Sequence, residues 1–219
     1  RNQVQVKDIR TKQKKTIPLL LYDLTELQRD ANNRFNYSAK EILNIMQRLY
    51  ENHKVLTYPR TDSRYLTLDI VPTLKERLMA CGTGPYKQLA GRLIHQPLPK
   101  KPFYVDNSKV SDHHAIIPTE QFVQLDHMTV DERRIYDLVV RRFLAVMYPS
   151  CQYEQTSITV KIQNEIFIAR GNVIKNPGWK EAYQTLAASD PDSDLESSDE
   201  EDLFCSRQIK KKKKGEVLP

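Results

Sequence analysis

The spacing of hydrophobic and polar positions divides the chain into a helical middle and two flanks of β type. Apolar residues recur every three or four positions at 24–35, 42–49 and 135–146, which predicts three amphipathic helices. Capping boxes at Ser38–Glu41 and Thr129–Glu132 predict where the second and the third of these helices begin. The middle of the chain is therefore expected to be helical.

Shorter elements are expected between and outside these helices. Two short helices are predicted at about 69–80 and 85–95, with Pro72 in a first helical turn. Alternation of apolar and polar residues predicts a strand at 3–9 and, later in the chain, a hairpin across Gln163-Asn164. The first strand is expected to stop where a basic stretch begins, and the last five residues are compatible with another strand.

These elements predict an α+β fold, in which a helical domain is inserted between segments of a β-rich domain. One stretch is expected to stay outside both, because its eight acidic residues and four serines are too polar to form an ordered core. The expected divisions are a β part at 1–22, the helical domain at 23–148, a continued β part at 149–188, an acidic disordered insertion at 189–202 and a last β part at 203–219.

The distribution of charge favours a polyanionic partner. Residues 189–202 carry −8 and residues 203–219 carry +5, so the net charge of +6 leaves +9 on the remaining 188 residues. A positive body of this kind attracts nucleic acid, although a generally basic surface would have the same composition.

The chain lacks the sequence features of a membrane or secreted protein. It contains no run of about 18 apolar residues, so no membrane contact is expected. Cys81, Cys151 and Cys205 lie far apart, which indicates neither a disulfide framework nor a zinc site and favours the reducing cytoplasm. Because the chain begins Arg1-Asn2 without a methionine, we expect a segment of a longer protein.

The first candidate for chemistry is the triplet Tyr58-Pro59-Arg60. Proline keeps the residue before it extended, and in an extended chain Tyr58, Arg60 and Asp62 would project to one side. A phenol is a weak nucleophile at neutral pH, because its reference pKa is about 10. A neighbouring guanidinium would favour the phenolate, grip a phosphate and stabilise charge developing on phosphorus. A buried aromatic followed by a surface arginine would have the same residues.

The second candidate is the segment Ser111–Thr119, in which Asp112 and two histidines precede a short apolar run. A histidine near a phosphate can donate a proton or stabilise the transition state. Because adjacent histidines point in different directions, a metal shared by His113 and His114 is not expected. The start of a helix would explain the same residues.

Together the two segments resemble the type IA DNA topoisomerase family. Tyr58–Ser63 (YPRTDS) resembles the active-site signature of that family, and the residues that follow are similar to its topoisomerase III branch. His113–Ile116 resembles the family's His-x-Ala-Ile motif, with His113 as the first histidine. The resemblance covers residues 1–183 well and residues 203–219 loosely.

The resemblance implies a role for each of these residues. Tyr58 matches the nucleophile that forms a 5′-phosphotyrosyl link, Arg60 the arginine that positions the scissile phosphate, and His113 the histidine beside that phosphate. Because bond energy stays in the enzyme–DNA link, relaxation or decatenation would need no ATP. Thr61, Asp62 and Ser63 are implied to form the supporting turn, and these three residues together with Arg64 are implied to contact DNA.

The resemblance also implies parts outside this chain. A domain absent from this chain would bind Mg²⁺, so no metal ligand is expected here and the chain alone is expected to be inactive. The helical domain would be the mobile domain that carries the tyrosine, and the β segments would belong to the arch from which it swings. The implied partner is a single-stranded segment of DNA. No small-molecule substrate is expected, and the oligomeric state stays open.

Two other functions fit the same residues. In a non-catalytic single-stranded nucleic-acid-binding module, Tyr58 would only stack on bases. In a structural or interaction domain, the acidic and lysine-rich tails would make the contacts. Covalent trapping of DNA by the intact protein separates the enzyme from the binding module, and an interaction domain predicts no effect of Tyr58→Phe on DNA chemistry.

Overall fold

The chain falls into two units, which we call the sheet unit and the helical unit. The computed structural model describes residues 4–97, 102–162, 165–183 and 217–218. The sheet unit draws on Arg1–Ile17, Ser150–Gly178 and Glu196–Pro219, and the helical unit on Pro18–Pro149 and Trp179–Leu195. The acidic insertion predicted at 189–202 lies outside the described residues, and so does Cys205.

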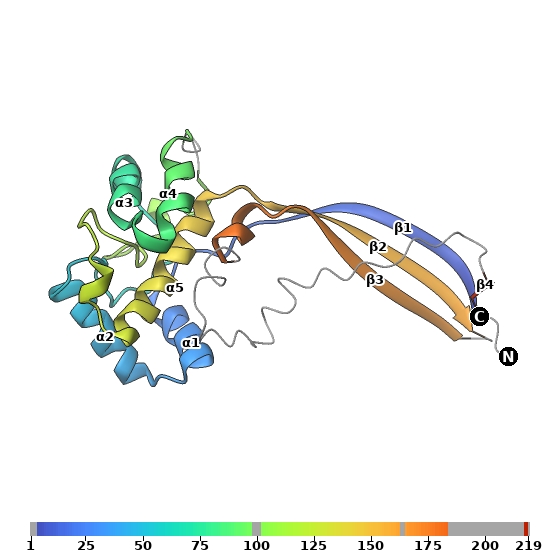
Figure 1. The fold of residues 1–219 in the computed structure, drawn as a ribbon, viewed down its shortest axis with the longest axis horizontal. Helices are drawn as coiled ribbons and strands as arrows, with labels where there is room; N and C mark the ends of the chain where they lie inside the picture. Colours follow the sequence, from blue (N-terminus) through green and yellow to red (C-terminus); the bar gives the residue numbers. More distant parts are fainter. Residues whose placement is uncertain (1–3, 98–101, 163–164, 184–216, 219) are drawn as a thin grey trace. The chain divides into compact units, whose positions relative to one another are not determined.

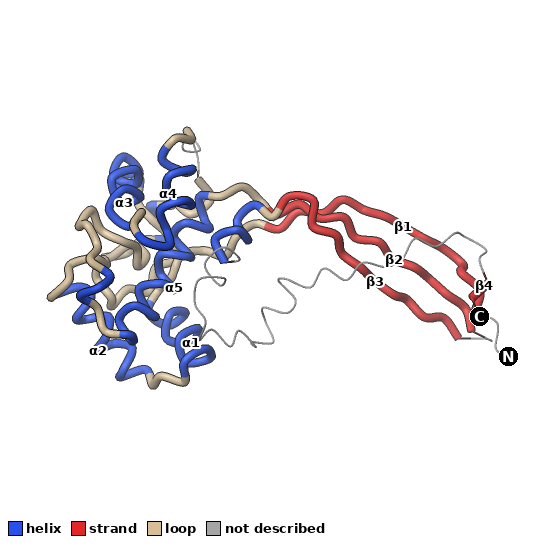
Figure 2. Tube along the Cα trace, in the orientation of Figure 1, coloured by secondary structure: helices blue, strands red, loops and turns tan. Residues whose placement is uncertain are grey.

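The sheet unit is an antiparallel sheet with the strand order β3-β2-β1-β4 (Figures 1 and 2). Its strands are β1 (Val4–Thr16), β2 (Cys151–Ile162), β3 (Glu165–Asn176) and β4 (Val217–Leu218). The pairing of β2 with β3 confirms the predicted hairpin, whose connecting residues 163–164 lie outside the described part. The short strand predicted near the C-terminus is β4.

Strand β1 runs well past its predicted end at residue 9. The basic stretch that follows stays paired with β2, from Arg10↔Ser157 to Thr16↔Cys151. Both faces of β1 are polar in this stretch, so no alternation of apolar and polar residues reveals the strand. Pairing with a strand that is distant in sequence, rather than a local pattern, makes this stretch β.

The helical unit packs around α5, which contacts α1, α2 and α4 (Figure 1). In the part described, its helices are α1 (Leu24–Phe35), α2 (Ala39–Glu51), α3 (Leu74–Cys81), α4 (Lys87–Ile94) and α5 (Val130–Met147). The helix predicted at 69–80 is divided, because a 3₁₀ turn at Leu68–Thr73 precedes α3. None of the described helices is long and apolar enough to cross a membrane.

Both predicted capping boxes are present. The Ser38 side chain accepts a hydrogen bond from Glu41 N at 3.3 Å, and a Glu41 carboxylate oxygen accepts one from Ser38 N at 2.8 Å. Thr129 and Glu132 exchange the same pair of bonds, at 3.2 and 2.9 Å. Each box satisfies backbone N–H groups that the first turn of a helix leaves unpaired, so the sequence correctly placed the starts of α2 and α5.

The helical unit extends beyond its predicted limits. Trp179 is 3% exposed and donates its backbone N–H to Pro149 O at 2.9 Å. Arg141 of α5 donates to the backbone oxygen of Tyr183 at 3.2 Å. Residues 179–183 therefore belong with the helices, and the predicted continuation of the β part through them is wrong.

The N-terminal limit of the helical unit also differs from the prediction. The division falls after Ile17, so residues 18–22 do not belong to the predicted β part at 1–22. Leu21 and Tyr22 are 0% and 1% exposed and pack in the helical core. Together the described helices and the antiparallel sheet make an α+β fold, as predicted.

A buried carboxylate joins the end of α2 to the start of α5. Glu132 is 4% exposed and accepts hydrogen bonds from Arg48 Nε at 2.7 Å and from Thr129 N, and His53 Nε2 lies 3.3 Å away. Burial alone would raise the pKa of Glu132, but the bonds from Arg48 and Thr129 and the nearby His53 lower it to about 2. The carboxylate therefore stabilises the folded state in its charged form.

We expect Glu132→Gln to lower the free energy of unfolding by about 1–3 kcal/mol at pH 7, the usual cost of disrupting a buried hydrogen-bonded group. The folded-state pKa is depressed, so the contribution of Glu132 is complete above its unfolded value and is lost as pH falls from 4.5 toward about 2. Denaturant unfolding of wild type and variant at pH 7 and pH 3 measures this. The difference between the two should shrink at pH 3.

The matched control is Glu41→Gln, which changes the same capping-box position in α2. Glu41 is exposed, and its partners within the described residues come from Ser38 alone. Its replacement should therefore destabilise the chain less than Glu132→Gln does. Equal losses for both variants would show that the cap, rather than the contact between α2 and α5, supplies the stability.

Candidate active site

The two sequence motifs lie side by side in the helical unit. We define three segments there: the central segment (Leu20–Leu24), the tyrosine segment (Val55–Leu66) and the histidine segment (Asp112–Thr119). The tyrosine and histidine segments run antiparallel, with Thr57 N donating to Ile117 O and Thr119 N donating to Val55 O, both at 3.0 Å. Motifs some fifty residues apart in sequence are thus held in register by their backbones.

The central segment binds both of the others. Tyr22 O accepts a hydrogen bond from Ile116 N of the histidine segment at 2.8 Å. Two residues later, Leu24 N donates to Thr61 O of the tyrosine segment at 3.1 Å. Tyr22 and Leu24 therefore connect the segments that carry Tyr58 and His113 through successive backbone groups.

Tyr58 packs against His113. The two ring centroids are 4.4 Å apart, and the ring planes are inclined by 41°. Tyr50 of α2 approaches the Tyr58 ring edge-on, with centroids 5.6 Å apart. Pro59, the residue after Tyr58, is buried, so the backbone next to the Tyr58 side chain is held in place.

Arg60 and His113 line one open cavity of about 560 Å³. The tyrosine segment also contributes Thr61 and Asp62 to its wall. The remaining lining residues are Leu24, Thr25, Leu43, Ser111 and Asp112. The cavity therefore lies where the three segments meet, with a cation and an imidazole in its wall.

The polar groups that the chemistry needs are available. Within the part of the chain that the structure describes, the Tyr58 hydroxyl forms no hydrogen bond, and Arg60 forms neither a hydrogen bond nor an ion pair. Arg60 and His113 are both exposed. The Arg60 guanidinium and the Tyr58 hydroxyl, which form no hydrogen bond among the described residues, and the exposed His113 imidazole are therefore available to bind a phosphate.

The hydroxyl groups of the motif build the turn after the tyrosine. Thr61 is 7% exposed, and its hydroxyl donates to His113 O at 2.7 Å. Ser63 is 4% exposed, and its hydroxyl donates to Lys109 O at 2.8 Å. These bonds agree with the supporting role implied for Thr61 and Ser63, while contact of either residue with DNA stays a prediction.

Asp62 and Arg64 have different surroundings. Asp62 is exposed in the cavity wall. Arg64 is half-buried, and its Nε donates to Leu21 O at 3.1 Å while Nη2 lies 3.8 Å from a Glu26 carboxylate oxygen. Arg64 thus holds the central segment, and its predicted contact with DNA is not tested by this arrangement.

The two adjacent histidines lie in different environments. His113 is exposed beside Tyr58, whereas His114 is half-buried with Nδ1 2.8 Å from Ala115 O. Burial lowers the pKa of His114 below its ordinary value. Among the described residues, no three His, Cys, Asp or Glu side chains come together as metal ligands.

Part of the cavity wall could not be predicted from the motifs. Leu43 lies on the less buried side of α2, and Thr25 lies in the first turn of α1. Neither has a local signal, because a residue facing a cavity on a helix has the same pattern as one facing solvent. Only the packing of α1 and α2 brings them to the tyrosine segment.

Comparison with known proteins identifies the family. The family model of DNA topoisomerase matches residues 1–216. A DNA topoisomerase 3 of Bacillus cereus is 59% identical over 189 residues, which cover 86% of this chain and 26% of that protein. DNA topoisomerase 3 of Bacillus subtilis (strain 168) is 46% identical over 192 residues, covering 88% of this chain and 26% of that protein.

A solved structure shares the fold. Full-length topoisomerase I from Thermotoga maritima superposes with a TM-score of 0.67 at 19% sequence identity, over 99% of this chain and 32% of that one. At this identity the likeness concerns the fold alone. It agrees with the α+β arrangement of the described helices and strands.

The chain belongs to the DNA topoisomerase family. Within that family it is a segment of a type IA topoisomerase of the topoisomerase III branch, as its motifs and its relatives both indicate. It spans about a quarter of the length of the curated relatives it matches, 26% in each case above.

Proposed function

We propose that this chain carries the DNA-cleaving tyrosine of the enzyme. The Tyr58 oxygen attacks a phosphorus atom of one strand, an O–P bond forms, and the bond from phosphorus to the 3′ oxygen breaks. The strand then ends in a 5′-phosphotyrosyl link and a 3′ hydroxyl that takes up the proton. Attack by that hydroxyl reverses the exchange. The strand is therefore resealed without ATP after another strand has passed, which relaxes or decatenates DNA.

The observation that carries this proposal is the packing of Tyr58 against His113 at 4.4 Å, beside the cavity that Arg60 lines. In this proposal Arg60 holds the scissile phosphate, because a guanidinium can donate two parallel bonds to phosphate oxygens. His113 is placed to donate a proton or a hydrogen bond as charge moves between the oxygens. Formation of a Mg²⁺-dependent covalent DNA adduct by the full-length protein tests the proposal.

The proposed enzyme needs parts beyond this chain. Magnesium, as the family implies, would be bound by a domain outside this chain. The helical unit would carry the tyrosine as the mobile domain, and the sheet unit would belong to the arch. We expect the 219-residue chain alone not to relax supercoiled DNA in the presence of Mg²⁺, as assayed on agarose gels. Efficient relaxation by the purified chain would contradict this.

One face of the sheet unit supports DNA as the partner. In an antiparallel sheet, residues directly opposite each other share a face, so the register assigns the paired side chains of β1 to β3 to one face or the other. Lys7 lies at the register shift between Val6 and Asp8, has no partner there, and is not assigned to a face. One face carries five basic residues and one acid, a net charge of +4. Those six residues are Asp8, Arg10, Lys12, Lys14, Lys161 and Arg170.

The charges assigned to the opposite face cancel. The register places Lys15, Glu154 and Glu165 there, and Lys175, which the register does not pair, lies beside Glu154 with its Nζ 3.9 Å from a Glu154 oxygen. The charge difference between the faces therefore follows from the sequence alternation in β1, where Lys12 and Lys14 share a side. A face of net positive charge attracts the phosphates of DNA over several ångströms.

We expect the double substitution Lys12→Gln with Lys14→Gln to weaken DNA binding by the full-length protein. Losing two phosphate contacts lowers the slope of log affinity against log salt by about 1.4 on single-stranded DNA, at about 0.7 for each contact. Fluorescence anisotropy with a labelled oligonucleotide at several salt concentrations measures this slope. The matched control, Lys15→Gln with Lys175→Gln, removes the same charge from the opposite face. An equal loss for both pairs would exclude a preferred face.

The alternative function is a non-catalytic single-stranded nucleic-acid-binding module. In that case Tyr58 would stack on a base and form no covalent bond. The His113 ring already lies against Tyr58, so one side of the Tyr58 ring is occupied. Recovery of DNA-linked protein after denaturation supports the enzyme, and binding without any adduct at all Mg²⁺ concentrations supports the module.

A further inference from the structure

The central segment is held by side chains as well as by the two motifs. Its backbone binds Ile116 N through Tyr22 O and Thr61 O through Leu24 N. The carbonyls of Leu20 and Leu21, which precede Tyr22, accept hydrogen bonds from arginine side chains. A displacement of this segment would therefore strain both motif segments through Tyr22 O and Leu24 N, in addition to the bonds that join those two segments directly.

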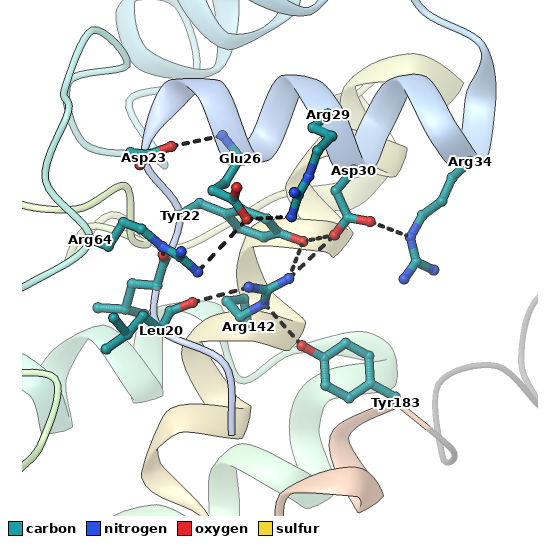
Figure 3. A network of polar contacts seen from close by, with 11 residues as sticks. Leu20, Tyr22, Asp23, Glu26, Arg29, Asp30, Arg34, Arg64, Arg142 and Tyr183 are labelled. Carbon is teal, nitrogen blue, oxygen red and sulfur yellow. Dashed lines mark hydrogen bonds and ion pairs between the residues drawn. The ribbon is translucent and has the colours of Figure 1, made fainter. Parts of the chain in front are cut away.

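Arg142 of α5 is the arginine that hydrogen-bonds to Leu20, the first residue of the central segment (Figure 3). Its Nη1 donates to Leu20 O at 3.0 Å, and its Nη2 donates to the Tyr22 hydroxyl at 3.0 Å. Its guanidinium carbon lies 4.1 Å from the centroid of the Tyr22 ring. One side chain thus fixes both the backbone and a side chain of the central segment.

The groups around Arg142 stabilise its buried positive charge. Arg142 is 5% exposed, and its other contacts are Asp30 at 3.3 Å and the Tyr183 hydroxyl at 3.2 Å (Figure 3). Burial alone would lower the pKa of Arg142, but Tyr22, Tyr183 and Asp30 hold it above its ordinary value. Arg142 therefore stays charged, and its planar guanidinium can keep the hydrogen bonds described above.

Arg142 is also tied to the rest of the helical unit. Asp30 of α1 accepts a hydrogen bond from the Tyr22 hydroxyl and another from Arg34 Nε at 3.1 Å. Arg64 of the tyrosine segment holds the neighbouring Leu21 O. The central segment is thus fixed between α5 and α1 on one side and the tyrosine segment on the other (Figure 3).

We propose that Arg142 is a positioning residue for DNA cleavage, which acts by holding the central segment so that Tyr58 and His113 keep their relative placement. The proposal rests on the cleavage function proposed above. Arg142 lies outside the cavity lining and touches neither Tyr58 nor His113 among the described contacts. Its loss should therefore affect the rate of bond cleavage and leave the affinity for DNA unchanged.

The test uses the full-length protein with a labelled single-stranded oligonucleotide and Mg²⁺. The rate constant for adduct formation is measured at saturating enzyme, and the dissociation constant is measured separately by anisotropy. For Arg142→Gln we expect a rate constant about 10–100-fold lower, because a misplacement of the order of 1 Å can cost about 100-fold. The dissociation constant should stay within about twofold of wild type.

Arg141→Gln is the matched control. Arg141 is the preceding residue of α5 and contacts Asp137 and the Tyr183 backbone, but no described residue of the central segment. Its replacement should leave the rate constant near that of wild type. Because Arg142→Gln removes a buried charge and can fail to fold, Tyr22→Phe is the second variant. It keeps the ring and removes the acceptor of one Arg142 bond, so we expect a smaller fall of the rate constant.

The amplitude and the rate constant of adduct formation separate the outcomes. A residue that only stabilises the fold would lower the amplitude, the fraction of active molecules, while the remaining molecules react at the wild-type rate. Wild-type rate constants for both Tyr22→Phe and a folded Arg142→Gln would overturn the proposal. If Arg142→Gln does not fold, an unchanged rate constant in Tyr22→Phe alone overturns it. Failure of the wild-type protein to form any adduct would instead refute the proposed function.

Discussion

Tyr58→Phe in the full-length protein is expected to abolish the covalent DNA adduct and to leave binding of single-stranded DNA intact. The substitution removes the oxygen that attacks phosphorus and keeps the ring that packs against His113. No described tyrosine other than Tyr50 approaches that ring. Denaturing gel electrophoresis of labelled DNA after incubation with Mg²⁺ detects the adduct, and anisotropy measures binding.

Tyr50→Phe is the control for this result. Tyr50 lies edge-on to Tyr58 and is 38% exposed, so it is the neighbouring phenol best placed to substitute for it. Its variant should retain the adduct. An adduct that survives Tyr58→Phe but disappears in Tyr50→Phe would assign the nucleophile to α2. Loss of binding together with the adduct would show that Tyr58 also anchors the DNA.

Local signals in the sequence predicted the helical elements well. The capping boxes at Ser38 and Thr129 placed two helix starts correctly, because a cap is a contact among residues only three positions apart. Strand β1 was predicted too short for the opposite reason. Lys12 and Lys14 are held in the sheet by β2, more than a hundred residues later in the chain. No window of local sequence contains that information.

The residues of the candidate site also divide into those that a local motif predicts and those that only distant contacts bring to the site. Tyr58, Arg60 and His113 were predicted from two short motifs, and the structure brings Tyr58 to His113 and places Arg60 and His113 on one cavity, while their roles stay predictions. Arg142 was not found, because an arginine among the apolar residues of α5 has the pattern of a helix whose polar side faces solvent. Its hydrogen bond to Leu20 O joins two residues that lie 122 positions apart in the sequence.

Arg60→Ala is expected to reduce the rate constant for cleavage far more than it reduces binding. Removing one group that stabilises developing charge costs about 100–1,000-fold in rate, because the contact strengthens as charge builds on phosphorus. Arg60 is exposed in the cavity wall without a described protein partner, so its substitution leaves no buried group unpaired. Single-turnover adduct formation and oligonucleotide anisotropy, both with the full-length protein, give the two quantities.

The effect on binding can be predicted separately. Loss of one phosphate contact should lower the salt slope of single-strand binding by about 0.7. Arg60→Lys distinguishes charge from geometry, because lysine keeps the positive charge but cannot donate two parallel bonds to one phosphate. We expect Arg60→Lys to restore the salt slope and to recover only part of the cleavage rate. Equal losses of cleavage and binding in Arg60→Ala would instead make Arg60 an anchor for the strand, with the charge on phosphorus stabilised by other groups.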